Sequence, residues 1–268
     1  IVSIRDWELT SEVASSYRSG HVFLVGDAAH RYPPSGGLGL NTGVGDAHNL
    51  AWKIAGVIAG WASKALLDSY DRERRPVANH NAAFSLENAM KMLDIFNHAG
   101  VFSEPGKQPS LDALRADASQ WNSLQASIED QRVHFDGLAL HLGAHYGRSD
   151  APDPFSNELQ CAQPGARLPH VWIKRGGERV SSHDLLSAGQ FTLLVPEALQ
   201  VDTTSLPTHW QVRRASEDFD ADANALHTLG LQGAFVLVRP DGHIAALLPT
   251  TDAWSNTLSS IAQSGIAA

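Results

Sequence analysis

Residues 22–50 read VFLVGDAAHRYPPSGGLGLNTGVGDAHNL, and this stretch decides the expected fold. Its first four residues are apolar and predict a short buried strand, which is followed by Gly26 and Asp27. A carboxylate at the carboxyl end of a strand is where α/β proteins hold the hydroxyl groups of a bound nucleotide. A turn or a helix cap would explain the same aspartate, so the residues alone leave both interpretations of Asp27 open.

A loop rich in proline and glycine comes next, made of Pro33, Pro34, Gly36, Gly37 and Gly39. Glycine lets a backbone approach a flat or bulky ligand closely. Asn41 and Thr42 are expected to cap a helix that begins near Gly43, whose free amide groups and positive dipole end would face this loop. Such a helix end stabilises a bound negative charge by roughly 0.3–2 kcal/mol.

Beyond residue 44 the apolar positions recur at helical spacing and predict an apolar face of about five turns. Its members are Val44, Ala47, Ala51, Ile54, Ile58 and Trp61. Asp46 is expected in the first turn, where the helix dipole favours a negative charge. Further helical segments are predicted from residue 65 and, in a new helix, from Pro76. The charged run DRERR at 71–75 between them indicates a solvated or domain-bridging face.

The second half of the chain has a different pattern. Gly, Asp and Pro in GRSDAPDPF at 147–155 interrupt all periodicity, so a domain boundary is expected there, with domains 1–150 and 151–268. Beyond it, strand candidates near 171, 191, 210, 235 and 243 alternate with short helical stretches, which is typical of a small α/β domain. RPDGH at 239–243 is expected to be a plain turn between strands.

Composition excludes several classes of function. The 268 residues include 18% charged residues and carry a net charge of -9, which makes nucleic acid an unexpected partner. The longest apolar stretch, 54–62, is far shorter than the roughly 20 residues that a membrane span needs. A single cysteine, Cys161, excludes an internal disulfide and favours a cytoplasmic location.

Two further features of the sequence do not indicate a metal or phosphate site. His141 and His145 have a spacing that can bind metal on a helix, but no third ligand with suitable spacing is visible, so no metal site is expected. The chain contains neither GxGxxG nor GxxxxGK[ST], so the glycine loop is not a known phosphate-binding fingerprint.

Because the first residue is Ile1 and a strand pattern begins at once, the sequence is expected to be a fragment of a longer protein.

Residues 20–78 carry a family resemblance. GDAAH, the PP..GG.G.N.G loop, DAHNLAWK and ERRPVA occur in this order and resemble the second flavin-binding motif of FAD-dependent aromatic-ring hydroxylases of the phenol and 2,4-dichlorophenol hydroxylase type. The segments at 164–177 and 234–247 are similar to the thioredoxin-like C-terminal domain of the larger members. The resemblance implies an α/β (α+β) fold, in which part of an FAD and substrate region with long helices precedes a thioredoxin-like domain.

The resemblance also implies roles for individual residues. Asp27, with Gly26 before it, would bind the ribityl and pyrophosphate region of FAD, and the amides of Leu40 and Asn41 would reach the pyrimidine edge of the flavin. Gly37 and Gly39 would let the backbone pass the cofactor. Substrate would be lined by Trp7, Pro33 and Pro34. No catalytic side chain is assigned.

The implied activity of the whole protein is hydroxylation of a small phenolic substrate. NAD(P)H would reduce FAD, and O2 would form a flavin C4a-hydroperoxide that transfers oxygen to the ring. A homodimer is also expected. Because the family's N-terminal GxGxxG segment is absent from this sequence, the chain alone is expected to bind FAD poorly and to be inactive. Two alternatives remain: a related flavoprotein that performs epoxidation, oxidation or halogenation, and a non-catalytic dimerisation or interaction module.

Overall fold

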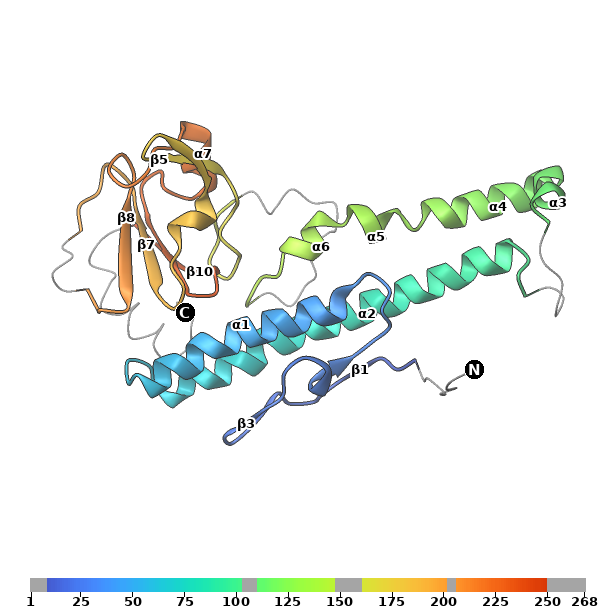
Figure 1. Cartoon of the computed structure of the whole chain (residues 1–268), viewed down its shortest axis with the longest axis horizontal. Helices are drawn as coiled ribbons and strands as arrows, with labels where there is room; N and C mark the ends of the chain where they lie inside the picture. Colours follow the sequence, from blue (N-terminus) through green and yellow to red (C-terminus); the bar gives the residue numbers. More distant parts are fainter. Residues whose placement is uncertain (1–8, 103–109, 148–160, 202–205, 250–268) are drawn as a thin grey trace. The chain divides into compact units, whose positions relative to one another are not determined.

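The computed structural model describes residues 9–102, 110–147, 161–201 and 206–249 (Figure 1). The chain forms two compact units. The first combines Ile1–Gly45 with Arg75–Gly137, and the second combines Asp46–Arg74 with Leu138–Ala268. Two long helices therefore contribute to both units. The predicted boundary between domains 1–150 and 151–268 lies outside the described residues and stays a prediction.

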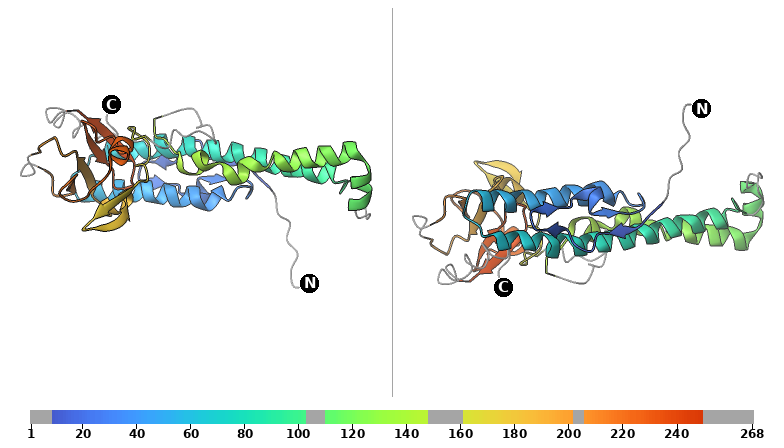
Figure 2. Two further views of the ribbon diagram at one scale, coloured as in Figure 1. Left: turned by 90° about the horizontal axis from the view of Figure 1, so that it is seen from above. Right: turned by 90° about the horizontal axis from the view of Figure 1, so that it is seen from below.

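The two long helices are α1 (Leu38–Ile58) and α2 (Asp68–His98), joined by the short 3-10 helix η2 (Lys64–Leu67). They lie side by side in the ribbon views (Figures 1 and 2). Side chains join them within each unit, since Asn81 donates to Thr42 in the first and Lys53 pairs with Glu73 in the second. Among the described residues, neither these helices nor any other combines the length and apolarity needed to cross a bilayer.

Pro76 lies inside α2 and does not begin a new helix, so the prediction of a break at this residue is wrong. Proline in a helix interior removes one backbone hydrogen bond and normally bends or breaks the helix. Here the residues flanking it, Glu73, Arg74 and Ala78, are all buried by tertiary contacts. Packing on both sides of Pro76 therefore outweighs its local cost.

The beginning of α1 also differs from the prediction. The helix starts at Leu38, about one turn before Gly43, so Asn41 and Thr42 lie inside it and are not caps. The Thr42 hydroxyl donates to the Leu38 carbonyl at 2.7 Å, and the Asn41 amide donates to the Gly37 carbonyl at 2.8 Å. Both side chains therefore bond backwards onto the preceding turn, which explains why capping residues are compatible with a helix interior here.

The apolar face predicted for α1 is largely exposed among the described residues. Val44 and Ile58 are 60% and 81% exposed, and Ala47 and Ala51 are exposed as well. The helix is amphipathic as predicted, but its polar face points inward. Asp46 illustrates the reversal: it lies in the third turn, completely buried against Arg74, and its assignment to the first turn is wrong.

Short strands and helices complete the first unit. Two two-stranded ladders, β1–β4 and β2–β3, flank the 3-10 turn η1 (Gly26–Ala28). Their bounds are β1 (Glu12–Val13), β2 (Arg18–Ser19), β3 (Val22–Phe23) and β4 (His30–Arg31). The strand expected over 22–25 is thus shorter than predicted, and the strand pattern that begins at Ile1 lies almost wholly outside the described residues.

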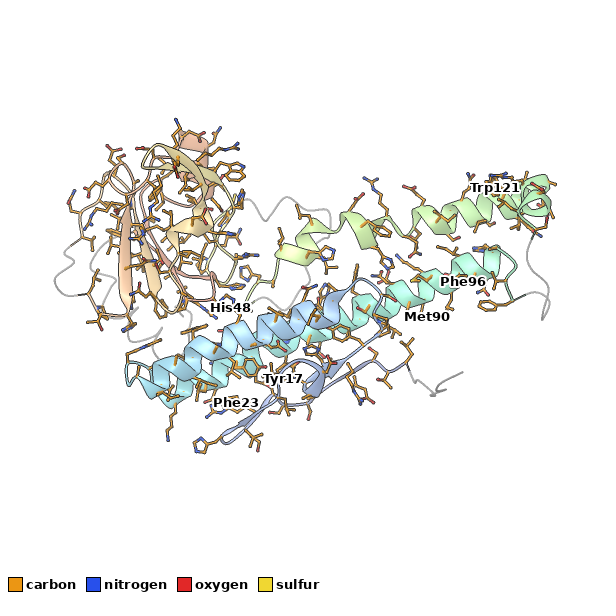
Figure 3. All side chains as sticks on the ribbon, in the orientation of Figure 1. Tyr17, Phe23, His48, Met90, Phe96 and Trp121 are labelled. Atoms are coloured by element: carbon orange, nitrogen blue, oxygen red, sulfur yellow. The ribbon has the colours of Figure 1, made fainter. Side chains whose placement is uncertain are left out.

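Three short helices follow in the first unit: α3 (Leu111–Ala116), α4 (Ala118–Glu129) and α5 (Arg132–Asp136). The side chains of Ser110 and Asp117 accept amide hydrogen bonds at the starts of α3 and α4, as N-caps do. Further along α2, Met90 and Phe96 stand exposed at 56% and 42% (Figure 3).

The second unit is built on a four-stranded mixed sheet of order β10-β9-β7-β8, in which only β7 and β8 are parallel. The sheet strands are β7 (Phe191–Val195), β8 (Trp210–Arg214), β9 (Phe235–Val238) and β10 (Ile244–Leu248). A hairpin of β5 (Trp172–Arg175) and β6 (Glu178–Ser181), the 3-10 helix η4 (Ser182–Leu185), α6 (Leu138–Leu142) and α7 (Ala223–Thr228) complete the unit.

Both faces of the central strand β7 are covered. Phe191 and Leu193 pack on one face with Trp52 of α1, and Leu194 packs on the other with Val236. A strand buried on both faces reads as a continuous apolar run, which is why FTLLV was recognisable from the sequence. The α/β class is confirmed. The thioredoxin-like architecture stays a prediction that this mixed sheet supports.

An aromatic cluster fixes the end of α1 in the second unit. The Trp61 ring stacks on His209, with ring centres 4.3 Å apart, and lies parallel to Trp52. The same ring covers Gly56: a Cβ at this position would be 2.5 Å from a Trp61 ring carbon. Glycine is therefore required at 56 by the close packing of Trp61 and not by its backbone conformation.

This packing makes a prediction about stability. In an exposed helix, Gly→Ala stabilises by about 1 kcal/mol. At position 56 we expect the opposite, because the new methyl group must displace Trp61: Gly56→Ala should lower the free energy of unfolding by about 1–3 kcal/mol. Urea denaturation followed by tryptophan fluorescence measures the change. A Gly56→Ala variant that is more stable than the wild type would contradict this account of Trp61.

Candidate functional site: the glycine loop and the first turn of α1

The residues expected to bind the cofactor lie together in the first unit. Asp27 is exposed on the 3-10 turn η1, directly after Gly26, whose φ of 59° is in the left-handed region. Gly26 lies against Gly43 of α1, because a Cβ built at Gly43 would be 3.1 Å from the Gly26 Cα. The two glycines thus allow η1 to lie directly on α1, and this contact places the Asp27 turn beside the helix.

The loop between them turns at two glycines. Gly36 and Gly37 have φ values of 102° and 66°, which side chains rarely tolerate, and the Gly37 amide donates to the Pro34 carbonyl at 3.1 Å. Pro34 is exposed whereas Pro33 is buried. Trp7, the other residue expected to line the substrate, lies outside the described residues.

The loop leads directly into α1. Leu40 in its first turn is 79% exposed, Asn41 is exposed beside it, and Gly39 is partly exposed. Backbone amides in the first turn of a helix lack carbonyl partners within that helix, so they are available to a ligand. The dipole adds a positive potential at the same place.

These residues fit a flavin nucleotide. An exposed carboxylate at Asp27 can accept bonds from sugar-like hydroxyl groups, and first-turn amides can donate to a carbonyl or to an anionic ring. Among the residues from 26 to 41, Asp27, Pro34, Gly37, Leu40 and Asn41 are all exposed. These five predicted cofactor residues are therefore individually accessible to a ligand.

Hydrogen bonds behind the loop support this surface. The Tyr32 hydroxyl donates to Thr42 Oγ1 at 2.6 Å, and Asn81 Nδ2 of α2 donates to the same oxygen at 2.8 Å. Thr42 donates in turn to Leu38 at the start of α1. These hydrogen bonds join Tyr32, which directly follows β4, to the beginning of α1 and to α2. Thr42, expected to be a cap, instead joins these three segments.

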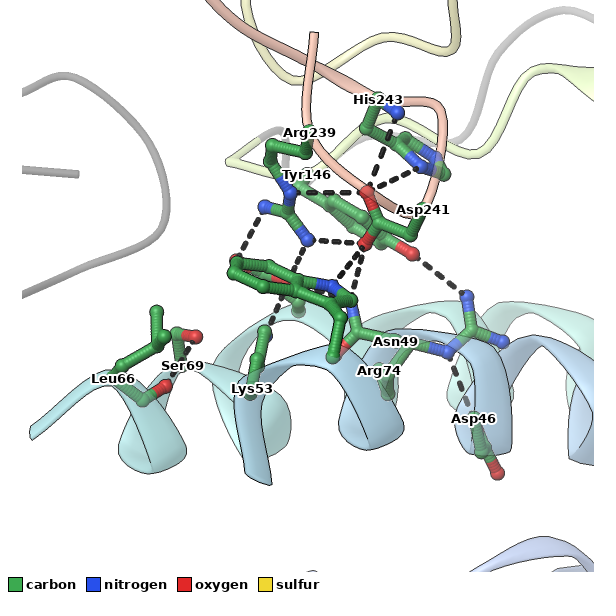
Figure 4. A network of polar contacts seen from close by, with 12 residues as sticks. Asp46, Asn49, Lys53, Leu66, Ser69, Arg74, Tyr146, Arg239, Asp241 and His243 are labelled. Atoms are coloured by element: carbon green, nitrogen blue, oxygen red, sulfur yellow. Dashed lines mark hydrogen bonds and ion pairs between the residues drawn. The ribbon is translucent and has the colours of Figure 1, made fainter. Parts of the chain in front are cut away.

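The polar face of α1 is held by a buried cluster of charges in the second unit (Figure 4). Glu73 of α2 accepts two parallel bonds from the Arg239 guanidinium, each 2.9 Å, and another at 2.7 Å from Lys53 Nζ of α1. Arg239 also pairs with Asp241 in the same turn. All four side chains are at most 6% exposed, and their charges balance.

Aromatic and amide groups complete this cluster. Trp52 Nε1 donates to Asp241 at 3.1 Å, and the Arg239 guanidinium lies over the Trp52 ring at 5.1 Å from its centre. Tyr146 lies on another side of Arg239 and accepts from Arg74, which binds Asp46 at 2.8 Å. The turn at 239–243 is thereby fastened to both long helices.

For the carboxylates of Glu73 and Asp241, the neighbouring positive charges lower the pKa more than burial raises it. Burial alone would raise the pKa of Glu73, but Arg239 and then Lys53 lower that pKa to about 2. Burial would likewise raise the pKa of Asp241, and Arg239 holds it well below its usual range. Lys53 behaves differently: burial lowers its pKa to about 8 in spite of the neighbouring Glu73. Lys53 is therefore the one member of this quartet with a pKa near physiological pH.

Comparison with known proteins agrees with the geometry. A family model described as "FAD binding domain" matches residues 1–85, and one described as "Aromatic-ring hydroxylase, C-terminal" matches residues 162–264. The chain belongs to the FAD-dependent aromatic-ring hydroxylases. In this hydroxylase chain, the first match includes the glycine loop and the second includes the Arg239 turn.

Relatives of the hydroxylase chain include a putative polyketide hydroxylase of Streptomyces halstedii, 36% identical over 89% of this chain and 42% of the relative. The 2,4-dichlorophenol 6-monooxygenase of Cupriavidus pinatubonensis is 30% identical over 91% of this chain and 46% of the relative. The crystal structure of the flavin-dependent monooxygenase PieE with FAD and substrate is 30% identical, with a TM-score of 0.80, over 96% of this chain and 50% of that protein. The chain thus spans about half the length of these proteins.

Sequence reasoning missed the charge cluster in this hydroxylase chain. RPDGH was expected to be a plain turn, yet Arg239 and Asp241 are 1% and 6% exposed. Of the DRERR run, Glu73 and Arg74 are buried, so the expectation of a solvated face is wrong for these two residues, whose charged partners lie in the same unit. The available signal was the helical spacing of polar residues at 46, 49 and 53, opposite the apolar face of α1.

The pKa of Lys53 predicts how the stability of the hydroxylase chain depends on pH. Lys53 titrates near 8 when folded and near 10.5 when unfolded, so the unfolded chain binds more protons between these values. The free energy of unfolding should therefore rise with pH, by about 3 kcal/mol over the whole interval, since one pH unit corresponds to about 1.4 kcal/mol. Lys53→Met should abolish this rise. Urea denaturation at pH 7.5, 8.5 and 9.5 measures it, and parallel curves for both proteins would contradict the assignment to Lys53.

Replacing Arg239 is expected to cause a large loss of stability. Arg239→Met should lower the free energy of unfolding by about 3–5 kcal/mol, because Glu73 and Asp241 would stay buried beside too little positive charge. The matched control is Arg179→Met, which removes an exposed arginine of the same unit and should change stability by less than about 1 kcal/mol. Equal losses in the two variants would show that the cluster does not hold the turn.

Proposed function

We propose that the whole protein is an FAD-dependent monooxygenase that hydroxylates a phenolic aromatic ring with NAD(P)H and O2. The observation that carries the proposal is that Asp27, on a turn packed against α1 through Gly26 and Gly43, is exposed, as are Leu40 and Asn41 in the first turn of that helix. Bound FAD would supply the redox and oxygen chemistry. The chain supplies the groups that bind and orient it.

In this proposal each cofactor residue has one task. Asp27, held beside α1 by the Gly26–Gly43 contact, accepts hydrogen bonds from the ribityl chain. The amides of Leu40 and Asn41 face the pyrimidine edge of the ring, where the helix dipole stabilises negative charge. Gly37 and Gly39 leave room for the ring to approach the backbone.

For the substrate, the proposal names only a chemical class and the residues that would contact it. A phenolic substrate is supported by relatives whose names include phenol 2-monooxygenase and 2,4-dichlorophenol 6-monooxygenase. Pro34, exposed at the bend of the loop, would lie in front of the flavin and contact the substrate ring; Trp7 and the buried Pro33 would contribute to the same wall. A homodimer and a cytoplasmic location remain predictions, the second from the single Cys161.

Oxygen labelling tests the reaction. The whole protein should oxidise NAD(P)H faster in the presence of a phenol, and the product should contain one atom of labelled oxygen from 18O2. Mass spectrometry of the product measures this incorporation. Product without the label would contradict hydroxylation and favour a flavoprotein that oxidises its substrate without oxygen transfer.

Substitution of Asp27 tests whether this residue contributes to FAD binding. We expect Asp27→Ala to weaken FAD binding at least tenfold, because the ribityl hydroxyl groups lose a charged acceptor. Stability of the FAD-free protein should not change, since Asp27 is exposed. Asp94→Ala, which removes an exposed aspartate of α2 in the same unit, is the control. Titration with FAD followed by flavin fluorescence measures affinity, and equal affinities of the two variants would rule out the role of Asp27.

A further inference from the structure

One face of α2 lies under the glycine loop in the first unit. Asn81, Ser85, Asn88 and Met92 follow each other at spacings of four, three and four, so they share this face. At one end, Asn81 donates to Thr42 of α1; at the other, the Ser35 hydroxyl contacts the Met92 sulfur at 3.9 Å. The segment from Ser35 to Thr42 therefore runs along this face of the helix.

Two buried polar side chains lie in the middle of this face. Ser85 and Asn88 are both 0% exposed. Among the described residues, the Ser85 hydroxyl and both amide atoms of Asn88 make no hydrogen bond. Buried polar groups are nearly always hydrogen-bonded, so unsatisfied ones require an explanation. A carboxamide can donate two bonds and accept two, and none of these is used here.

The Asn88 amide lies against the loop. A Cβ built at Gly36 would be 3.4 Å from Asn88 Nδ2 and 3.7 Å from the Phe84 ring. The backbone of Gly36, with a φ of 102°, is at the turn that precedes the first turn of α1. A glycine can change its backbone angles at little cost, so the Gly36 peptide groups can rotate toward the amide. A peptide group and a carboxamide offer matching donors and acceptors.

We propose that Asn88 is a positioning residue for the glycine loop. When FAD is bound, the side-chain amide of Asn88 hydrogen-bonds the backbone at Gly36, and Ser85 supports it from the next turn of α2. This bond fixes the loop and hence the first-turn amides that face the flavin. Asn88 acts through the loop and does not touch the cofactor. The inference rests on the proposed binding of FAD by this loop.

The proposal predicts that substitution separates cofactor binding from stability. Asn88→Leu keeps the number of side-chain heavy atoms and the branch at Cγ, and it removes every hydrogen-bonding group of the side chain. In the whole protein it should raise the Kd for FAD about tenfold. The melting temperature of the FAD-free protein should stay the same or rise, because a buried amide without a partner has been replaced by an apolar group. A purely structural asparagine would instead lower that melting temperature.

Hydrogen exchange of the loop gives a second readout. In the wild type, FAD should slow exchange of the amides of residues 36 and 37 at least tenfold, and in Asn88→Leu this protection should be lost. The matched control is Asn79→Leu, which changes an exposed asparagine of the same helix and should leave affinity and protection unaltered. Asn88→Ala is the second variant if leucine prevents folding, and it should lose the same protection.

The outcomes distinguish this inference from the proposed function. Wild-type protein that does not bind FAD would overturn both. Wild-type protein that binds FAD, with Asn88→Leu equal to it in affinity and in loop protection, would overturn only the role of Asn88. A tenfold weaker affinity, with an unchanged melting temperature of the FAD-free protein and lost protection of residues 36 and 37, is the expected result.

Discussion

The ion pairs around Glu73 determine how α1 is oriented. A buried carboxylate is unfavourable unless cations and hydrogen bonds surround it, and Glu73 receives both from Arg239 and Lys53. Because Lys53 comes from α1 and Arg239 from the turn after β9, the cluster joins helix and sheet in one unit. Removing any one charge leaves the others buried and unbalanced, so the contribution of each charged residue to stability depends on the presence of the others.

The orientation imposed by this cluster has consequences along the whole helix. Its polar side must face inward, so Asp46 and Asn49 are buried while Val44 and Ile58 are exposed. At the beginning of the same helix, the first turn is left accessible beside Asp27. The long helix therefore has a different environment in each unit: its later turns anchor the mixed sheet, and its exposed first turn is the proposed place for the cofactor.

Elements of the fold could be predicted from the sequence where the local residue pattern matches the environment of those residues in the structure. The fully buried, mostly apolar strand β7 and the glycine loop were recognisable because burial on both faces and close backbone approach leave a clear composition. Pro76 and Thr42 were misjudged, since tertiary packing and backward hydrogen bonding outweighed their usual local preferences. The Arg239 cluster was not predicted, because its members are far apart in sequence and each resembles an ordinary surface residue; only the polar spacing along α1 indicated a buried polar face.

A crystal structure of the whole protein with FAD tests the central claim most directly, which is that the first turn of α1 and the Asp27 turn form the flavin site. The account predicts the ribityl chain within hydrogen-bonding distance of the Asp27 carboxylate. It also predicts the pyrimidine edge of the ring against the amides of Leu40 and Asn41. A flavin bound away from residues 26–41 would contradict it.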